Sequence, residues 1–112
     1  MEKLKDGTDA AMLLIAHSGD ARSFAFKALQ LAKKGDFDEA REEIKNAEAS
    51  SVLAHQAQTD LLVDEANGIR VDINVLMVHA QDHLMLSMLA LELIQEMIEL
   101  HESKANREEK TK

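Results

Sequence analysis

The sequence predicts an all-α fold, an antiparallel three-helix bundle whose helices run up, down and up. The 112 residues include no Pro and only four Gly, so the turn punctuation of β-rich folds is missing. Hydrophobic residues make up 46% of the chain and are nearly all aliphatic, which with abundant Glu, Lys and Gln favours long helices. Gly-containing breaks at 33–36 and 67–70 leave three stretches, which we expect to form a single domain over 1–112.

The first helix is predicted over residues 8–34, where apolar side chains recur at three- and four-residue spacing. Thr8 or Asp9 is suited to cap its first turn. Gly19 interrupts the pattern at a cost of about 1 kcal/mol relative to Ala. A residue this small would let another helix approach closely. The helix should end where Gly35 can adopt the left-handed conformation.

The second helix is predicted over residues 38–65, with Asp36 or Asp38 as its cap. Its acidic first turn suits the positive end of the helix dipole. Small side chains form a narrow stripe along one face, so this helix should pack closely against a neighbour. The stripe comprises Ala40, Ile44, Ala47, Ser51, Ala54 and Gln58.

The third helix is predicted over residues 71–103, with Asp72 or Asn74 as its cap. Residues 71–75 alternate in polarity and would also suit a short strand. We favour the helix, because an isolated strand would have no partner. Residues 104–112 are almost wholly charged or polar and are predicted to form a disordered tail.

Two separate apolar arcs run along the third predicted helix. Together they form a wider apolar surface than the two neighbouring helices of the same chain would cover. This surplus predicts self-association of the chain. The alternatives are that the apolar face is simply wide, or that it binds a different partner. The first arc holds Met77, Ala80, Leu84, Met88, Leu91 and Ile98. The second arc holds Leu86, Leu89, Ala90, Leu93 and Met97.

The composition also excludes several classes of protein. Without Cys there is no disulfide framework, iron–sulfur cluster or cysteine nucleophile. A net charge of -8 argues against binding nucleic acid through a broad cationic surface. No apolar run is long enough to cross a membrane, and the N-terminus lacks a secretory signal. We therefore expect a cytoplasmic protein without direct membrane insertion.

Three ionisable residues, His79, Asp82 and His83, extend the second apolar arc toward the N-terminus. Their spacing places them on one helix face, where they are costly unless paired, metal-bound or functional. Zinc would need a fourth ligand, whereas several copies of Asp82 around a symmetry axis would suit Mg²⁺ or Ca²⁺. A neutral imidazole is also a nucleophile that can accept and pass on a phosphoryl group. A purely structural role for the histidines remains the competing interpretation.

The stretch 78–85, VHAQDHLM, resembles the enzyme IIA component of the lactose/chitobiose (cellobiose) class of the bacterial phosphoenolpyruvate-dependent sugar phosphotransferase system. The resemblance extends over residues 8–103. Weaker matches support it at 18–23, at 35–37 and in the second predicted helix at Ala54, His55, Gln58 and Thr59. It implies a homotrimer of three-helix bundles whose third helices pack about the threefold axis.

The same resemblance implies roles for individual residues. His79 matches the histidine phosphorylated at Nε2, which receives the phosphoryl group from HPr and donates it to a cysteine of the cognate enzyme IIB. Gln81 and His83 match residues that hydrogen-bond the phosphoryl group, from a neighbouring subunit. Asp82 matches the aspartate that meets its two symmetry mates near the axis, where Mg²⁺ or another divalent cation can bind.

The remaining histidines carry no predicted catalytic role. We expect His17 and His101 to be structural or surface residues, and His55 to serve helix packing. The resemblance implies uptake of a disaccharide of the lactose, cellobiose or chitobiose type, and the run at 79–81 is closer to the chitobiose/cellobiose branch. A non-enzymatic helical oligomerisation module is the competing hypothesis.

Overall fold

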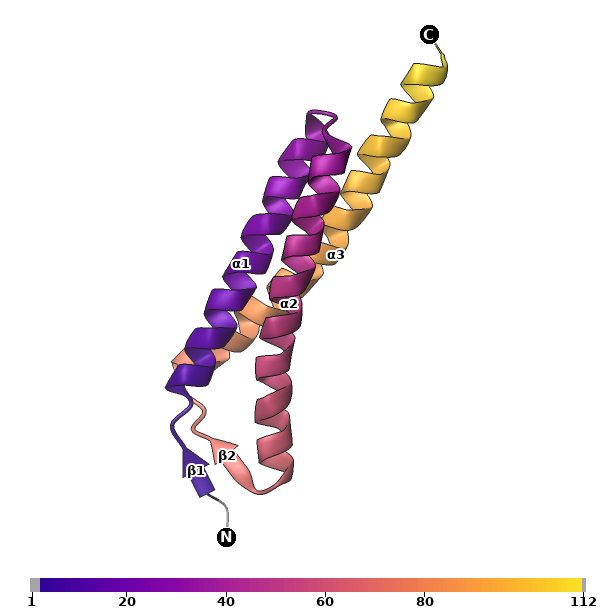
Figure 1. Cartoon of the computed structure of the whole chain (residues 1–112). Helices are drawn as coiled ribbons and strands as arrows, with labels where there is room; N and C mark the ends of the chain where they lie inside the picture. The colour runs from indigo at the N-terminus through magenta and orange to yellow at the C-terminus, as the bar shows by residue number, and fades with distance from the viewer. Residues whose placement is uncertain (1–2, 112) are drawn as a thin grey trace.

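The protein forms three long helices, α1 (Thr8–Lys33), α2 (Phe37–Ala66) and α3 (Val75–Lys110), that lie side by side (Figure 1). The computed structural model describes residues 3–111. The helices alternate in direction and give a rod of 71 × 19 × 19 Å. This architecture confirms the predicted antiparallel three-helix bundle.

Gly35 makes the turn between α1 and α2, as its position in the sequence predicted. Its φ of +87° lies in the left-handed region that favours glycine. The N–H of Gly35 donates to Ala32 O and that of Asp36 to Leu31 O, both at 3.0 Å, which satisfies carbonyls at the end of α1. Asp36 is the N-cap of α2, which therefore begins one residue before its predicted start.

The start of α1 is organised by residues ahead of those predicted to cap it. Gly7, rather than Thr8 or Asp9, is the N-cap, and Asp6 supplies the side-chain acceptor. The Asp6 carboxylate accepts from Thr8 N–H at 2.9 Å and from Thr8 Oγ1 at 2.6 Å. The predicted caps therefore lie within the first helical turn.

A two-stranded parallel sheet closes the end of the rod opposite the α1–α2 turn (Figure 1). It pairs β1 (Lys3–Lys5) with β2 (Ile69–Val71), with Leu4 opposite Arg70. The predicted helical start at residue 71 is therefore wrong, because the N-terminal segment supplies the partner that the strand was expected to lack. The helix begins after Asn74, a predicted cap, whose side chain accepts from Met77 N–H at 2.9 Å.

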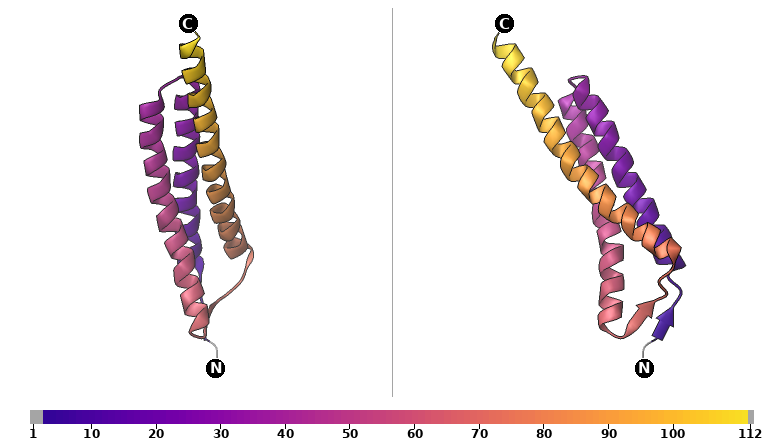
Figure 2. Two further views of the ribbon diagram at one scale, coloured as in Figure 1. Left: turned by 90° about the vertical axis from the view of Figure 1, so that its right-hand side faces the viewer. Right: turned by 180° about the vertical axis from the view of Figure 1, so that it is seen from behind.

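The predicted disordered tail at 104–112 is helical as far as Lys110, and Lys112 lies outside the described residues. Glu and Lys are good helix formers, and Lys104 and Glu108 form an ion pair at 3.9 Å with helical i,i+4 spacing. In both views of Figure 2, this end of α3 extends past the α1–α2 turn. Polarity alone therefore did not end the helix.

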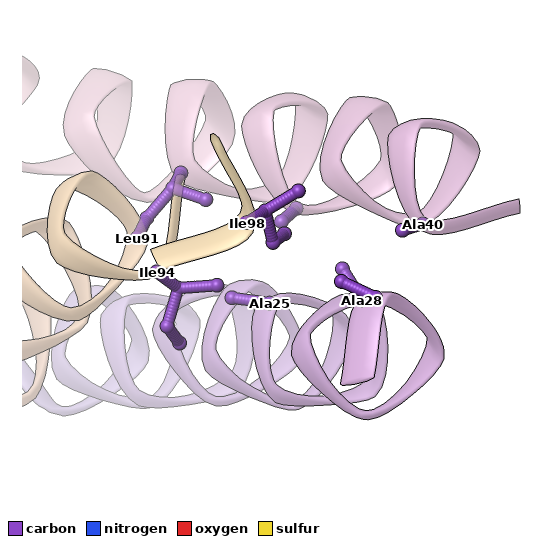
Figure 3. Close-up of a cluster of buried hydrophobic side chains, with 8 residues drawn as sticks. Ala25, Ala28, Ala40, Leu91, Ile94 and Ile98 are labelled. Carbon is purple, nitrogen blue, oxygen red and sulfur yellow. The ribbon is translucent and has the colours of Figure 1, made fainter. Parts of the chain in front are cut away.

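The interior consists of two apolar clusters stacked along the rod, with many alanines on the facing sides of α1 and α2. These small side chains let the two helices approach closely, as the small stripe on the second helix predicted. The strand-end core comprises Ala11, Leu14, Ala54, Met77, Ala80 and Leu84. The turn-end core comprises Ala25, Ala28, Ala32, Ala40, Ala47, Leu91, Ile94 and Ile98, and Figure 3 shows side chains from all three helices pointing together there.

Among the described residues, the structure shows no helix packed closely against Gly19, where the sequence allowed one. Gly19 lies within α1, but a Cβ added to it would meet nothing within 4 Å. No helix of the described chain therefore uses this position for close contact.

The two apolar arcs of α3 have opposite environments. The first arc faces α1 and α2 and supplies buried residues to both cores. The second arc stays largely in the open, and we call four of its members the outer stripe of α3. Their exposed fractions are 66% for Leu86, 52% for Leu89, 50% for Leu93 and 43% for Met97. No helix in residues 3–111 is long and apolar enough to cross a membrane.

Candidate functional site

His79 and His83 face each other one turn apart near the start of α3. Their Nε2 atoms lie 3.0 Å apart, which is a hydrogen-bond distance. The ring centroids are 4.5 Å apart and the ring planes meet at 86°, an edge-to-face arrangement. His79 is exposed and His83 is half-buried. The i,i+4 spacing thus brings both imidazoles to one face, as the sequence predicted.

The two histidines lie in a groove between α1 and α3, which we call the histidine groove. The wall from α1 includes Arg22 and Phe26, and the Arg22 guanidinium lies over the Phe26 ring at 5.5 Å from its centroid. The wall from α3 includes Asp82 together with the two imidazoles. An anion in this groove would therefore meet one guanidinium and two imidazole rings.

A buried hydroxyl that the sequence analysis did not single out lies on the α1 side of the groove. Ser18 is fully buried, and its Oγ has no hydrogen-bond partner among the described residues. Ser87 approaches from α3, where its Oγ donates to Leu84 O at 3.0 Å. The helical period of the small residues in α1 signals that Ser18 faces inward, but it does not reveal its neighbour on α3.

Asp82 is exposed in the histidine groove and precedes Leu86 by one turn. It therefore continues the outer stripe of α3 toward the N-terminus. Within residues 3–111 of one chain, no three His, Asp or Glu side chains gather in a way that could hold a metal ion. One chain therefore offers at most part of the predicted cation site.

Gln81 lies on another side of α3, away from the histidine groove. Its Oε1 accepts from Gln58 Nε2 of α2 at 2.7 Å, and its Nε2 lies 3.6 Å from Met77 Sδ. Two residues along a helix correspond to a rotation of about 200°, which explains the separation from His79. The chain itself therefore does not bring Gln81 to the paired imidazoles.

The other histidines lie apart from the site. His55 is exposed on α2, so its predicted role in helix packing is wrong. It directly follows buried Ala54 and is rotated by about 100° from that inward direction. His17 is half-buried and His101 is exposed, in keeping with structural and surface positions.

A helical bundle that presents a pair of imidazoles in an open groove is suited to carry a group transiently on nitrogen. Residues 9–102 match the model of the family described as the PTS system lactose/cellobiose-specific IIA subunit. The chain belongs to this family, and it is therefore an enzyme IIA component and a phosphotransferase subunit. The competing hypothesis of a non-enzymatic module is thereby excluded.

Individual relatives show how far the similarity extends. The chain is 47% identical over 94 residues to the N,N'-diacetylchitobiose-specific EIIA component of Escherichia coli strain K12, covering 84% of this chain and 81% of that one. The chain is also similar to the crystal structure of the cellobiose-specific enzyme IIA from Bacillus anthracis, with 41% sequence identity and a TM-score of 0.88. The match covers 91% of this chain and 94% of that one.

The chitobiose component of Escherichia coli was also solved with a partner bound. The solution structure of the Escherichia coli IIA(chitobiose)–HPr complex is 41% identical in sequence, with a TM-score of 0.75. The match covers 90% of this chain and 98% of that one. Both solved relatives therefore share the bundle over nearly its whole length.

Proposed function

We propose that this enzyme IIA accepts a phosphoryl group from HPr on His79 Nε2 and passes it to a cysteine of its cognate enzyme IIB. The transfer serves uptake of a disaccharide of the lactose, cellobiose or chitobiose type, with the chitobiose/cellobiose branch favoured. The observation that carries the proposal is an exposed imidazole whose Nε2 has a second imidazole Nε2 at 3.0 Å.

The chemistry needs a lone pair on His79 Nε2. That lone pair attacks phosphorus, the N–P bond forms, and the bond from phosphorus to HPr breaks with its electron pair returning to HPr. In the second transfer a thiolate of enzyme IIB attacks phosphorus, and the N–P electron pair returns to His79. Imidazole suits both steps, because near neutral pH it is both a nucleophile and a good leaving group.

The surface around His79 supports docking of protein partners. Val75, Val78 and Met85 are between 51% and 85% exposed and flank the histidine on α3. Exposed apolar side chains, and the flexible Met85 above all, can pack against more than one partner surface. The solved complex of the chitobiose relative with HPr supports HPr as one partner.

The outer stripe of α3 supports assembly as a homotrimer. Leu86, Leu89, Leu93 and Met97 recur at three- and four-residue spacing and remain substantially exposed in the single chain. Packing three copies of α3 about a threefold axis would bury this stripe against itself. The same packing would bring Gln81 of one chain toward a neighbouring site, whereas His83 already lies 3.0 Å from His79 within its own chain.

Three copies of α3 would also bring together three copies of Asp82. Like carboxylates that share a site must be protonated or share a cation, and an all-oxygen ligand set suits Mg²⁺ or another hard divalent cation. The position of Asp82 in line with the outer stripe fits this arrangement. We therefore propose one cation for each trimer, held by Asp82 of all three chains.

The central test is phosphorylation of the purified chain with phosphoenolpyruvate, enzyme I and HPr. We expect one phosphoryl group per chain, acid-labile as phosphohistidine is. Labelling should disappear in His79→Gln and survive in His17→Gln, the control for loss of another histidine on the bundle. Labelling that persists without His79 would overturn the assignment.

A further inference from the structure

We infer that His83 holds the resting His79 as the reactive tautomer and covers its Nε2 until a phosphoryl donor arrives. The inference rests on the proposed function and concerns how the same site is controlled. His83 would donate from Nε2 to His79 Nε2 in the resting protein. It would donate from the same nitrogen to a phosphoryl oxygen once His79 is phosphorylated.

Only one proton can lie between the two Nε2 atoms of the paired imidazoles. Two Nε2 atoms at 3.0 Å form a hydrogen bond only when one carries hydrogen and the other offers a lone pair. If both nitrogens were protonated, two N–H groups would point at each other. The pair therefore has one donor and one acceptor, and this choice fixes the tautomer of each ring.

The proposed chemistry determines which ring donates. His79 needs its Nε2 lone pair to attack phosphorus, so its own proton must reside on Nδ1. His83 must then be the Nε2–H tautomer. The reverse arrangement would place a proton on the nitrogen that is to be phosphorylated, and that nitrogen would have no lone pair for the attack.

The hydrogen bond also blocks the nitrogen that it prepares. The His79 Nε2 lone pair points at His83, so phosphorus cannot approach along that direction while the contact persists. Rotation of the His83 ring would free the lone pair. After transfer, the N–P bond occupies Nε2 and the His83 N–H can bind a phosphoryl oxygen, so one donor serves both states.

No other described side chain that lines the histidine groove is placed to replace His83 as the hydrogen-bond donor to His79. The charged residues that line the groove with them are Asp82, from α3, and Arg22, from α1, and α2 contributes no lining residue. The Arg22 guanidinium lies over Phe26, and Asp82 is exposed. His83 is the side chain that the structure places in hydrogen-bond contact with the reactive nitrogen.

Long-range ¹H–¹⁵N correlation spectra of the unphosphorylated full chain test the resting state. At about pH 8.5, where an ordinary imidazole is neutral, we expect the proton of His79 on Nδ1 and that of His83 on Nε2. The two rings are assigned with His79→Gln and His83→Gln. A His79 ring protonated at Nε2 in the wild-type chain would overturn the inference.

Two variants test the donor. His83→Phe keeps an aromatic ring but removes the N–H, so the His79 tautomers should become mixed and phosphohistidine should be lost about tenfold faster. His83→Gln restores an N–H donor and should recover most of both properties. His101→Phe, an exposed histidine on the same helix, is the matched control and should change neither.

The outcomes separate this inference from the proposed function. If His83→Phe leaves the His79 spectrum and the phosphohistidine lifetime as in the wild type, His83 is not the donor. If His83→Phe does not fold, the wild-type tautomers alone decide. If the phosphorylation relay never labels His79, the proposed function fails, while the spectra of the unphosphorylated chain still decide the resting hydrogen bond.

Discussion

Asp6 illustrates how one side chain at the start of α1 makes stability depend on pH. The hydrogen bond from the Thr8 hydroxyl, followed by that from the Thr8 N–H, lowers the pKa of Asp6 below its ordinary value of 3.8. Both bonds favour the carboxylate, so the folded chain binds this proton less readily than the unfolded chain. The stabilisation is complete above pH 3.8 and is lost as the pH falls through the lower pKa of the folded state.

Replacement of Asp6 checks this dependence. At neutral pH, Asp6→Asn should melt at a lower temperature than the wild type, because a neutral amide oxygen is a weaker acceptor for Thr8. The difference should close as the pH falls below 3.8 and through the lower pKa of Asp6 in the folded chain, where the wild-type carboxyl gains its proton. Asp20→Asn, exposed on the same helix, is the control. A melting difference that is constant with pH would contradict this account.

The residues of the site were predictable to different degrees. His79, Asp82 and His83 share one helix, so their spacing alone places them on one face. Ser18 and Arg22 come from α1, and their place beside the histidines depends on how α1 and α3 are aligned lengthwise. Periodicity within one helix carries no information about that alignment. The same limitation explains why the sequence did not reveal the Gln58–Gln81 contact.

Among the elements, helices were predicted well and strands were not. Each helix is specified by its own periodicity, and Gly35 marks the end of α1, whereas no glycine marks either end of α3. The strand β2 depends instead on β1, a segment far away in the chain. A three-residue strand offers too short a pattern to compete with the helical signal that follows it. The missing information was a long-range contact, which local patterns do not contain.

Gly7 tests how closely these strands pack against the helices. A Cβ at Gly7 would overlap Val71 Cγ1 and lie 2.8 Å from Met77 Cε. Gly7→Ala should therefore displace β2 or α3 and lower the free energy of unfolding by about 1–3 kcal/mol, measured by urea denaturation. Gly19→Ala is the matched control, with open space around its Cβ, and should raise it by up to about 1 kcal/mol. Equal effects at the two positions would refute this difference in packing.

At the scale of the whole molecule, the outer stripe of α3 should govern self-association. Leu89→Glu places a charge in the proposed interface and should lower the sedimenting mass from three chains to one, with helical circular dichroism retained. Leu53→Glu on α2 is the control, since Leu53 is 53% exposed and Leu89 is 52% exposed. A wild-type chain that sediments as a monomer at micromolar concentration would remove the basis for the trimer.

The proposed cation gives a separate measurement on the assembly. Adding Mg²⁺ to metal-free protein should raise the melting temperature, because a ligand that binds only the native state stabilises it. Asp82→Leu should abolish this shift and leave the trimer assembled. Asp20→Leu should retain the shift, since Asp20 lies on α1 outside the histidine groove. Magnesium sensitivity that persists in Asp82→Leu would place the cation elsewhere.

The pairing of β1 with β2 also has a consequence for the order of folding. The two strands are parallel, so a short hairpin turn cannot connect them. The ion pair between Lys5 and Asp64 likewise joins residues that are 59 positions apart in the sequence. Closing so long a loop is entropically costly until α1 and α2 have folded back on each other. The strand β1 is therefore among the last elements to reach its native contacts, and its pairing with β2 reports that the bundle is complete.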